Sequence, residues 1–392
     1  VIFPPTSTSA PSSLPKLTAA EGKVKFDREQ IDIEIKRGKS NGLLIENGQV
    51  LLTGLDKIDQ HVAVRFEIKG PIGSAIKFAN SSSMKHLESI GYAPNLIKGK
   101  FSSKIKLDFI PEKGLTLDKI RMSTKGILKN IEVPKIALDL NLTMGELKFK
   151  ADNDNMTIMG NGQLSGVKTE LEWHENFTNK KLYSRKYRLK AIVNEENWRE
   201  KLKLTFPPFN KTYTNGVIGA DVTIKVSNDG SGELKANLDL KDTLITLPRL
   251  GWYKPEKIAA DAFITATFLN DRFESIPKVV YTGGGLNLTA NASFKSDGVL
   301  KQVNINHFKF GQTDVQAIIA PHSDPENEGW NIHVSGKQLD LIEWMASEDM
   351  VSQKTKGVPL IFSLNLDAIQ LYPNKNLLDV NGVISFDGWV WK

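Results

Sequence analysis

The residues best suited to chemistry are scattered along this 392-residue chain rather than grouped into known motifs. None of the six histidines pairs with another at helical i, i+4 spacing, and His-Glu-x-x-His, Gly-x-Ser-x-Gly and Walker sequences do not occur. Cysteine is absent, which excludes disulfides, thiol nucleophiles and cysteine-bound metals. The sequence therefore predicts no enzyme: no catalytic residue, no metal ion and no cofactor.

Two short segments resemble ligand loops and are better explained as turns. Asp152-Asn153-Asp154-Asn155 begins like a calcium loop, but the glycine at position six and the glutamate at position twelve are missing. Gly283-Gly284-Gly285 is followed by a strand pattern instead of the helix that a phosphate loop requires. We expect a polar turn at the first segment and a turn or bulge at the second.

The most concentrated positive charge lies in the segment from Asn179 to Lys190. In a strand, Arg185 would share one face with Tyr183 and Tyr187, and Lys186 and Arg188 would lie on the other face. Such a strand suits anionic lipid headgroups, single-stranded nucleic acid, or simply water. The whole chain has 51 basic and 45 acidic residues, a net charge of +6, which is too mild for a dedicated nucleic-acid binder.

Alternation with period two dominates the rest of the chain and predicts many strands, each with one apolar face. The clearest in-phase apolar sets are Val62-Val64-Phe66-Ile68, Ile105-Leu107-Phe109, Ile136-Leu138-Leu140, Val222-Ile224-Val226, Leu286-Leu288 and Leu364-Leu366. Five Asn-Gly and three Asp-Gly pairs favour primed turns and hence antiparallel hairpins. Helical patterns are few and short, at 84–90, 197–204 and 339–346.

So many apolar strand faces must be covered, and three short helices cannot cover them. The sheet must therefore curl, as a sandwich or barrel with an interior filled by its own side chains, or as a trough whose apolar interior is left for a ligand. Ordinary packing favours the filled interior, and an acyl chain is the natural ligand for a long apolar trough. Periodicity alone leaves both open.

Four stretches, in order, resemble the AsmA-like proteins of Gram-negative envelopes, in particular the large YhdP-type branch. The first is Gly54–Asp59 followed by HVAVRFEIKGP, and the second is LESIGYAPNLIKGKFSSKIKLDFIP. The densest runs from Asn194 to Pro255, through NGVIGADVTIKV and KANLDLKDTLITLPRL to GWYKP. The last is SGKQLDL at 335–341. Together they cover nearly the whole chain after residue 15.

This resemblance implies a bridge-like lipid conduit: an inner-membrane anchor, then a long β-trough that crosses the periplasm and carries phospholipid to the outer membrane. We accordingly expect an all-β fold with few short helices, in which an elongated antiparallel sheet curls into a trough with an apolar interior. The apolar sets given above are the candidate groove residues. For the cationic segment from Asn179 to Lys190, the resemblance favours contact with lipid headgroups over contact with nucleic acid. The candidate headgroup contacts are Arg185, Lys186 and Arg188, and no nucleic-acid partner is expected.

The expected organisation is a Pro- and Ser-rich linker over residues 1–15, then two continuous parts of the trough, 16–190 and 191–392. The chain starts without Met and stops within a strand-like pattern, so we expect the anchor and the membrane partners to belong to missing parts of a longer protein.

The main rival is an envelope-assembly scaffold with a packed interior, the role ascribed to TamB-like relatives. An aspartate at Leu138 or Ile224 would separate the two, because it should block a conduit without unfolding it and should unfold a packed core. An enzyme acting on envelope polysaccharide would need clustered carboxylates on one face.

Overall fold

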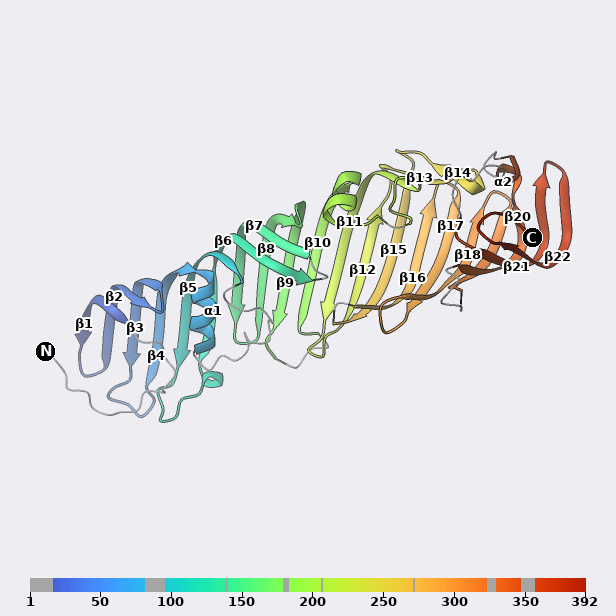
Figure 1. The fold of residues 1–392 in the computed structure, drawn as a ribbon. Coiled ribbons are helices and arrows are strands. Elements are labelled where there is room, and N and C mark those ends of the chain that lie inside the picture. The colour runs from blue at the N-terminus through green and yellow to red at the C-terminus, as the bar shows by residue number, and fades with distance from the viewer. Residues whose placement is uncertain are drawn as a thin grey trace. The chain divides into compact units, whose positions relative to one another are not determined.

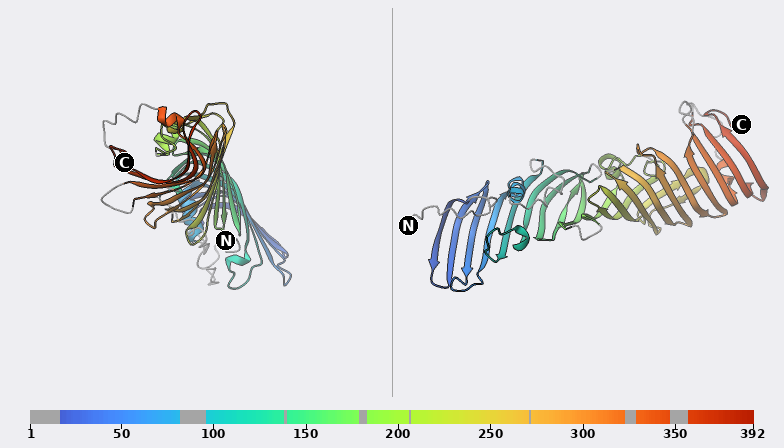
Figure 2. Two further views of the ribbon diagram at one scale, coloured as in Figure 1. Left: turned by 90° about the vertical axis from the view of Figure 1, so that its right-hand side faces the viewer. Right: turned by 90° about the horizontal axis from the view of Figure 1, so that it is seen from below.

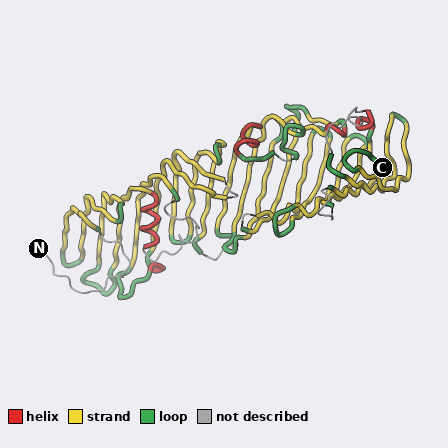
Figure 3. The backbone as a smooth tube through the Cα atoms, in the orientation of Figure 1, coloured by secondary structure: helices red, strands yellow, loops and turns green. Residues whose placement is uncertain are grey.

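The computed structural model describes residues 17–81, 96–137, 140–178, 183–205, 207–270, 272–322, 329–346 and 357–392. The predicted linker over residues 1–15 and the predicted helix over 84–90 lie outside these ranges. Contacts within the chain divide it into two compact units, Val1–Tyr187 and Arg188–Lys392. Each unit is built almost entirely of strands (Figures 1 and 3).

The first unit is a ladder of consecutive antiparallel strands. Its strands are β1 (Thr18–Phe26), β2 (Gln30–Ser40), β3 (Leu43–Thr53), β4 (His61–Pro71), β5 (Lys98–Phe109), β6 (Arg121–Ala137), β7 (Leu140–Asp152), β8 (Asn155–Leu164), β9 (Val167–Asn176) and the start of β10 (Arg185–Asn194). Helix α1 (Ile72–Ser81) follows β4, and the single turn η2 (Leu117–Lys119) precedes β6.

The second unit repeats this plan with one inserted hairpin. The main sheet pairs β11 (Thr214–Val226), β12 (Ser231–Asp239), β15 (Ala260–Leu269), β16 (Arg272–Gly283), β17 (Leu286–Phe294), β18 (Leu300–Phe310), β19 (Thr313–Pro321), β20 (Trp330–Asp340), β21 (Leu360–Tyr372) and β22 (Lys375–Phe386) in that order. The hairpin of β13 (Thr243–Leu247) and β14 (Trp252–Lys254) pairs with the beginning of β11 as a small second sheet. Short helical elements η3 (Asn197–Lys201), η4 (Pro248–Leu250) and α2 (Ile342–Ala346) complete the unit.

The strand pairs described in both units are antiparallel, with one exception. Strand β21 runs parallel to β20 because the chain passes through α2 between them, and a crossover of this kind returns the chain in the same direction. The predicted all-β, antiparallel fold with few short helices is confirmed.

Local register shifts explain why these sheets curl instead of lying flat (Figure 2). In the first unit, shifts lie near Asn47 in β3, Gly99 in β5 and Asn130 in β6, and all three residues have positive φ. In the second unit, shifts occur on neighbouring strands from β15 to β21. Each bulge bends its strand and increases its twist, so bulges on adjacent strands bend the whole sheet.

Turns lie at the Asp-Gly pairs as predicted, but mostly not at the Asn-Gly pairs. Asn41-Gly42, Asp229-Gly230 and Asp297-Gly298 join consecutive strands, and Asp387-Gly388 lies between Phe386 and Trp391, which form an isolated antiparallel bridge. Among these pairs, only Asn41-Gly42 has the positive φ at both residues that a primed turn requires. The other four Asn-Gly pairs lie inside strands β3, β8, β11 and β22. At two of these positions a side chain would collide with a neighbouring segment: a Cβ on Gly48 would meet the Ile35 side chain at 3.0 Å, and one on Gly216 would meet the Asp242 carbonyl oxygen at 2.6 Å.

The helices differ from the predicted ones. The first, α1, was not indicated by the sequence pattern, and its Ala75 packs on a cluster of Leu43, Ile45 and Ile68. The predicted helix at 197–204 is a five-residue π-turn, and the one at 339–346 begins only at Ile342, because β20 extends to Asp340.

Candidate functional site: the apolar sheet face

The candidate site is the sheet face on which the alternating apolar residues meet. In the first unit one register row crosses six strands, in the order Val24, Ile33, Val50, Val64, Leu107 and Met122. The predicted sets on β4 and β5 both lie on this face, paired as Val62 with Phe109, Val64 with Leu107 and Phe66 with Ile105. The register therefore joins these two predicted sets into one surface, which we call the apolar face.

The second unit has an apolar face of its own that crosses all ten strands of its main sheet. One row runs through Ala220, Leu238, Ala262, Tyr281, Leu288, Phe308, Val315, Gly336, Leu366 and Val380. The neighbouring row runs through Val222, Ala236, Ile264, Val279, Ala290, Ile305, Ala317, Val334, Leu364 and Gly382. The predicted sets on β11, β17 and β21 all lie on this face.

The opposite face of the second sheet is largely polar, so the two sides differ sharply. A row on that side contains Asp239, Asp261, Thr282, Asn287, Lys309 and Asp314. Water can solvate these groups while the other side requires an apolar covering.

The candidate groove residues differ in how deeply they are buried. Ile68 is 1% exposed and Leu366 is 2% exposed, and each belongs to a packed cluster. Val62, Ile224, Leu286 and Leu364 are also buried. The remaining described candidates are half-buried, namely Val64, Phe66, Ile105, Leu107, Phe109, Leu140, Val222, Val226 and Leu288. Leu138 lies outside the described residues, and the side chain of Ile136 is likewise not described. Strand β6 ends at Ala137 and β7 begins at Leu140, so Ile136 and Leu140 lie on two different strands and not on the single strand that the alternation predicts.

The half-buried positions are the ones at which a ligand could touch the protein. Short elements cover parts of the apolar face: α1 packs over Leu43 and Ile68, and Trp252 of β14 packs edge-on against Tyr281 at 6.1 Å between ring centroids. No group of residues in the described ranges could hold a metal ion. None of the helices described is long and apolar enough to cross a bilayer.

A buried carboxyl group interrupts the apolar face of the first unit. Glu175 continues the inward-facing series of Leu171 and Trp173 on β9 and is 1% exposed. The Trp173 indole Nε1 donates to its Oε2 at 2.9 Å, and the Arg185 Nε lies 3.9 Å from its Oε1. Burial removes water from the Glu175 carboxyl group and raises its pKa to about 7, although the contacts with Trp173 and Arg185 both act to lower it. The alternation of β9 was a sufficient signal for this site, but the sequence analysis did not use it.

This pKa predicts a pH-dependent stability. The folded-state pKa is about 7 and the ordinary value is 4.5, so the folded protein holds an extra proton between these pH values. Stability therefore falls as pH rises from about 4.5 to 7, by about 3 kcal/mol in total. Glu175→Gln should abolish this slope in urea unfolding measured at pH 5 and pH 8, whereas the exposed control Glu170→Gln should keep it. An unchanged slope in Glu175→Gln would contradict the assignment.

The three headgroup candidates fall on different sides of the sheet, as alternation predicts. Arg185 lies on the apolar side next to Glu175, while Lys186 and Arg188 lie together on the opposite side of β10. Arg188 forms a two-pronged ion pair with Asp221, at 3.2 and 2.8 Å. That pair holds the pKa of Asp221 below its usual value. Arg188 therefore has a structural partner already.

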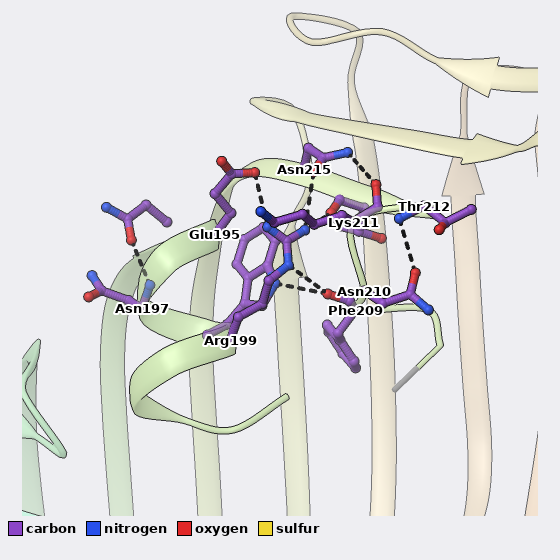
Figure 4. A network of polar contacts seen from close by, with 11 residues as sticks. Glu195, Asn197, Arg199, Phe209, Asn210, Lys211, Thr212 and Asn215 are labelled. Carbon is purple, nitrogen blue, oxygen red and sulfur yellow. Dashed lines mark hydrogen bonds and ion pairs between the residues drawn. The ribbon is translucent and has the colours of Figure 1, made fainter. Parts of the chain in front are cut away.

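A polar network fastens η3 to the loop that precedes β11 in the second unit (Figure 4). The Arg199 guanidinium donates to the backbone carbonyls of Phe209 and Thr214 and to the side chains of Glu195 and Asn215. The indole of Trp198, 1% exposed, donates to the same Phe209 carbonyl at 3.1 Å. The sequence gives no indication of this network, because its acceptors are mostly backbone carbonyls.

Removing the guanidinium should destabilise the second unit. Arg199→Met leaves the Thr214 carbonyl without its charged donor, and bonds to charged groups contribute about 1.5–3 kcal/mol each. We expect a loss of about 3 kcal/mol in urea unfolding. Lys211→Met, an exposed change in the same loop, should stay within about 0.5 kcal/mol. Equal effects of the two substitutions would show that the network is dispensable.

Lys254 stabilises the β13–β14 insertion through hydrogen bonds from its buried side chain. Its side chain is fully buried, and its ammonium donates to the carbonyls of Lys241, Pro255 and Ile258 at 3.2, 3.0 and 2.9 Å. Burial lowers its pKa. This lysine is a structural element of the turn and is not available to a ligand.

Fold and face together define a class: an all-β protein whose curled, antiparallel sheets each carry a one-sided apolar surface. A comparison with protein families gives the particular family. The chain belongs to the YhdP protein family, whose sequence model matches residues 11–392. Searches of curated proteins and of solved structures found no significant match. Membership of this family suggests a bridge-like role in lipid transport.

Proposed function

We propose that this chain is a periplasmic, non-enzymatic segment of a bridge-like protein that carries phospholipids between the inner and outer membranes. The acyl chains would lie against the apolar face, and the headgroups would stay at the polar margin of the sheet. The single observation that supports this most strongly is the continuity of the apolar rows, which cross ten successive strands of the second unit without a charged residue.

Such a surface needs no catalytic residue to move lipid. It replaces the contacts that an acyl chain makes in a bilayer, worth about 0.8 kcal/mol per CH₂, with contacts to Val, Leu, Ile and Phe side chains. Because the rows repeat from strand to strand, each step of a sliding chain exchanges one apolar contact for an equivalent one. No large barrier then separates neighbouring positions along a sheet.

Site-specific photo-crosslinking tests this proposal with neighbouring residues on opposite faces. Benzoylphenylalanine replaces Phe66 or Phe308 on the apolar faces, and Arg65 or Lys309 on the opposite faces. After irradiation in a Gram-negative envelope, we expect phospholipid adducts at Phe66 and Phe308 and none at Arg65 or Lys309. Equal labelling of both faces, or no labelling at either apolar position, would contradict the proposal and favour the scaffold with a packed interior.

A further inference from the structure

A lattice of lysines covers the opposite, solvated face of the first unit. In register, Lys104 of β5 lies directly opposite Lys125 of β6, which lies directly opposite Lys150 of β7. Lys106 and Lys148 are the next residues on the same side of β5 and β7. All five side chains are exposed. We call these five residues the lysine lattice.

Adjacent strands lie about 4.8 Å apart, and residues i and i+2 of a strand about 7 Å apart. The lattice is thus a two-dimensional array of cations across three strands, and like charges directly opposite one another destabilise a sheet.

Neighbouring carboxylates do not neutralise this array. Glu67 pairs with Lys104 at 3.0 Å, and Glu146 pairs with Lys129, outside the lattice, at 3.2 Å. Asp152 accepts the backbone N–H groups of residues 154 and 155 and so caps the β7–β8 turn. Within the described residues, Lys106, Lys125, Lys148 and Lys150 make no ion pair.

We propose that the lysine lattice docks the first unit on an anionic lipid bilayer surface. A broad array suits a surface with many charges, whereas a linear polyanion is better matched by a single row or a groove. Lysine is a compact point charge that binds by Coulomb attraction, which is how polybasic patches hold anionic lipid surfaces. Half-exposed Met159 and half-buried Ile127, both register neighbours of Lys148, add apolar contact.

Single-stranded nucleic acid fits this face poorly. Recognition of bases requires aromatic platforms, and the residues of β5, β6 and β7 on this side contain none: Lys100, Ser102, Lys104, Lys106, Asp108, Arg121, Ser123, Lys125, Ile127, Lys129, Glu146, Lys148, Lys150 and Asp152.

Vesicle flotation of the whole chain tests the docking. The probes are vesicles of phosphatidylcholine alone and vesicles containing 30% phosphatidylglycerol, each at low and high salt. We expect at least tenfold stronger partitioning onto the anionic vesicles at low salt, with most of the difference lost at high salt. The triple variant Lys106→Glu/Lys125→Glu/Lys150→Glu should lose at least tenfold of this binding.

A control variant changes net charge equally. Lys301→Glu/Lys337→Glu/Lys375→Glu alters exposed lysines of the second unit and should lose less than twofold. The variant Lys106→Gln/Lys125→Gln/Lys150→Gln controls for misfolding of the glutamate variant, because it removes repulsion between the lysines without adding carboxylates. It should bind the anionic vesicles at least threefold more weakly than the parent chain. Equal losses in the lattice and control variants, or no preference for anionic vesicles, would overturn the proposal. So would stronger capture by soluble polyglutamate than by vesicles, which would point to an acidic protein partner.

This docking is independent of the proposed lipid path. Photo-crosslinking at Phe66 reports on the apolar face, and flotation reports on the opposite one. Lipid adducts without salt-sensitive flotation would remove only the docking surface, and flotation without adducts would remove only the lipid path.

Discussion

Leu366→Asp is expected to unfold the second unit. Leu366 is 2% exposed and lies in a cluster with Val315, Val334 and Ile369. An aspartate there removes a buried leucine side chain, at a cost of about 2–5 kcal/mol, and adds an unpaired buried carboxyl group. The sum approaches the whole stability of an ordinary domain.

Circular dichroism and urea unfolding measure this directly, and Asn365→Asp is the matched control. Asn365 is the preceding residue of β21 and points to the opposite, exposed side. We expect the control to unfold within about 0.5 kcal/mol of the parent chain. A folded, cooperative Leu366→Asp protein would mean that this part of the apolar face is open to water.

Leu107→Asp combined with Leu288→Asp is expected to remove bound lipid while leaving the fold in place. Both leucines are half-buried members of the apolar rows, so their carboxylates can reach water at the surface when no lipid is present. For an acyl chain the same carboxylates are a barrier, because an aspartate in an apolar lipid environment costs about 2.5–3.5 kcal/mol. Lipid occupancy next to each substitution should fall about 100-fold.

The matched control for this pair is Ser123→Asp combined with Asn287→Asp. These are exposed residues on the opposite faces, and they carry the same change in charge. Lipid extracted from each purified variant and measured per chain gives the readout, with thermal unfolding to check the fold. If the control loses as much lipid as the leucine variant, the lipid is not held by the apolar faces.

Strand faces could be predicted from the sequence because side chains alternate with period two. The pairing of Val62-Val64-Phe66-Ile68 with Ile105-Leu107-Phe109 follows once β4 and β5 are neighbours. The bulges could not be predicted. At Asn130 the apolar series of β6 changes phase, from Leu128 to Ile131, and a sequence containing both Ile127 and Leu128 is compatible with either phase.

How deeply each apolar side chain is buried could not be predicted from the sequence either. Ile224 alternates in the same way as Val222 and Val226, yet it is 3% exposed while its two neighbours are half-buried. An aspartate at Ile224 would unfold the chain whether or not the apolar face binds lipid, so it does not separate a conduit from a packed scaffold. Leu107 and Leu288 do, because they are partly accessible.

Buried polar groups could be predicted from the sequence only in part. Glu175 follows from the alternation of β9, which places it with Leu171 and Trp173. Lys254 does not follow from any local pattern, because its three acceptors are backbone carbonyls created by the turn that it stabilises. Contacts of this kind are visible only when the path of the main chain is known.

Native mass spectrometry of the chain purified from a Gram-negative host tests the central claim most directly. The account predicts several phospholipids per chain, identified by extraction, and their loss in the Leu107→Asp/Leu288→Asp variant but not in the Ser123→Asp/Asn287→Asp control. A single lipid-free mass for the parent chain, with cooperative unfolding and no uptake of lipid from vesicles, would contradict it and would identify the apolar faces as an ordinary packed core.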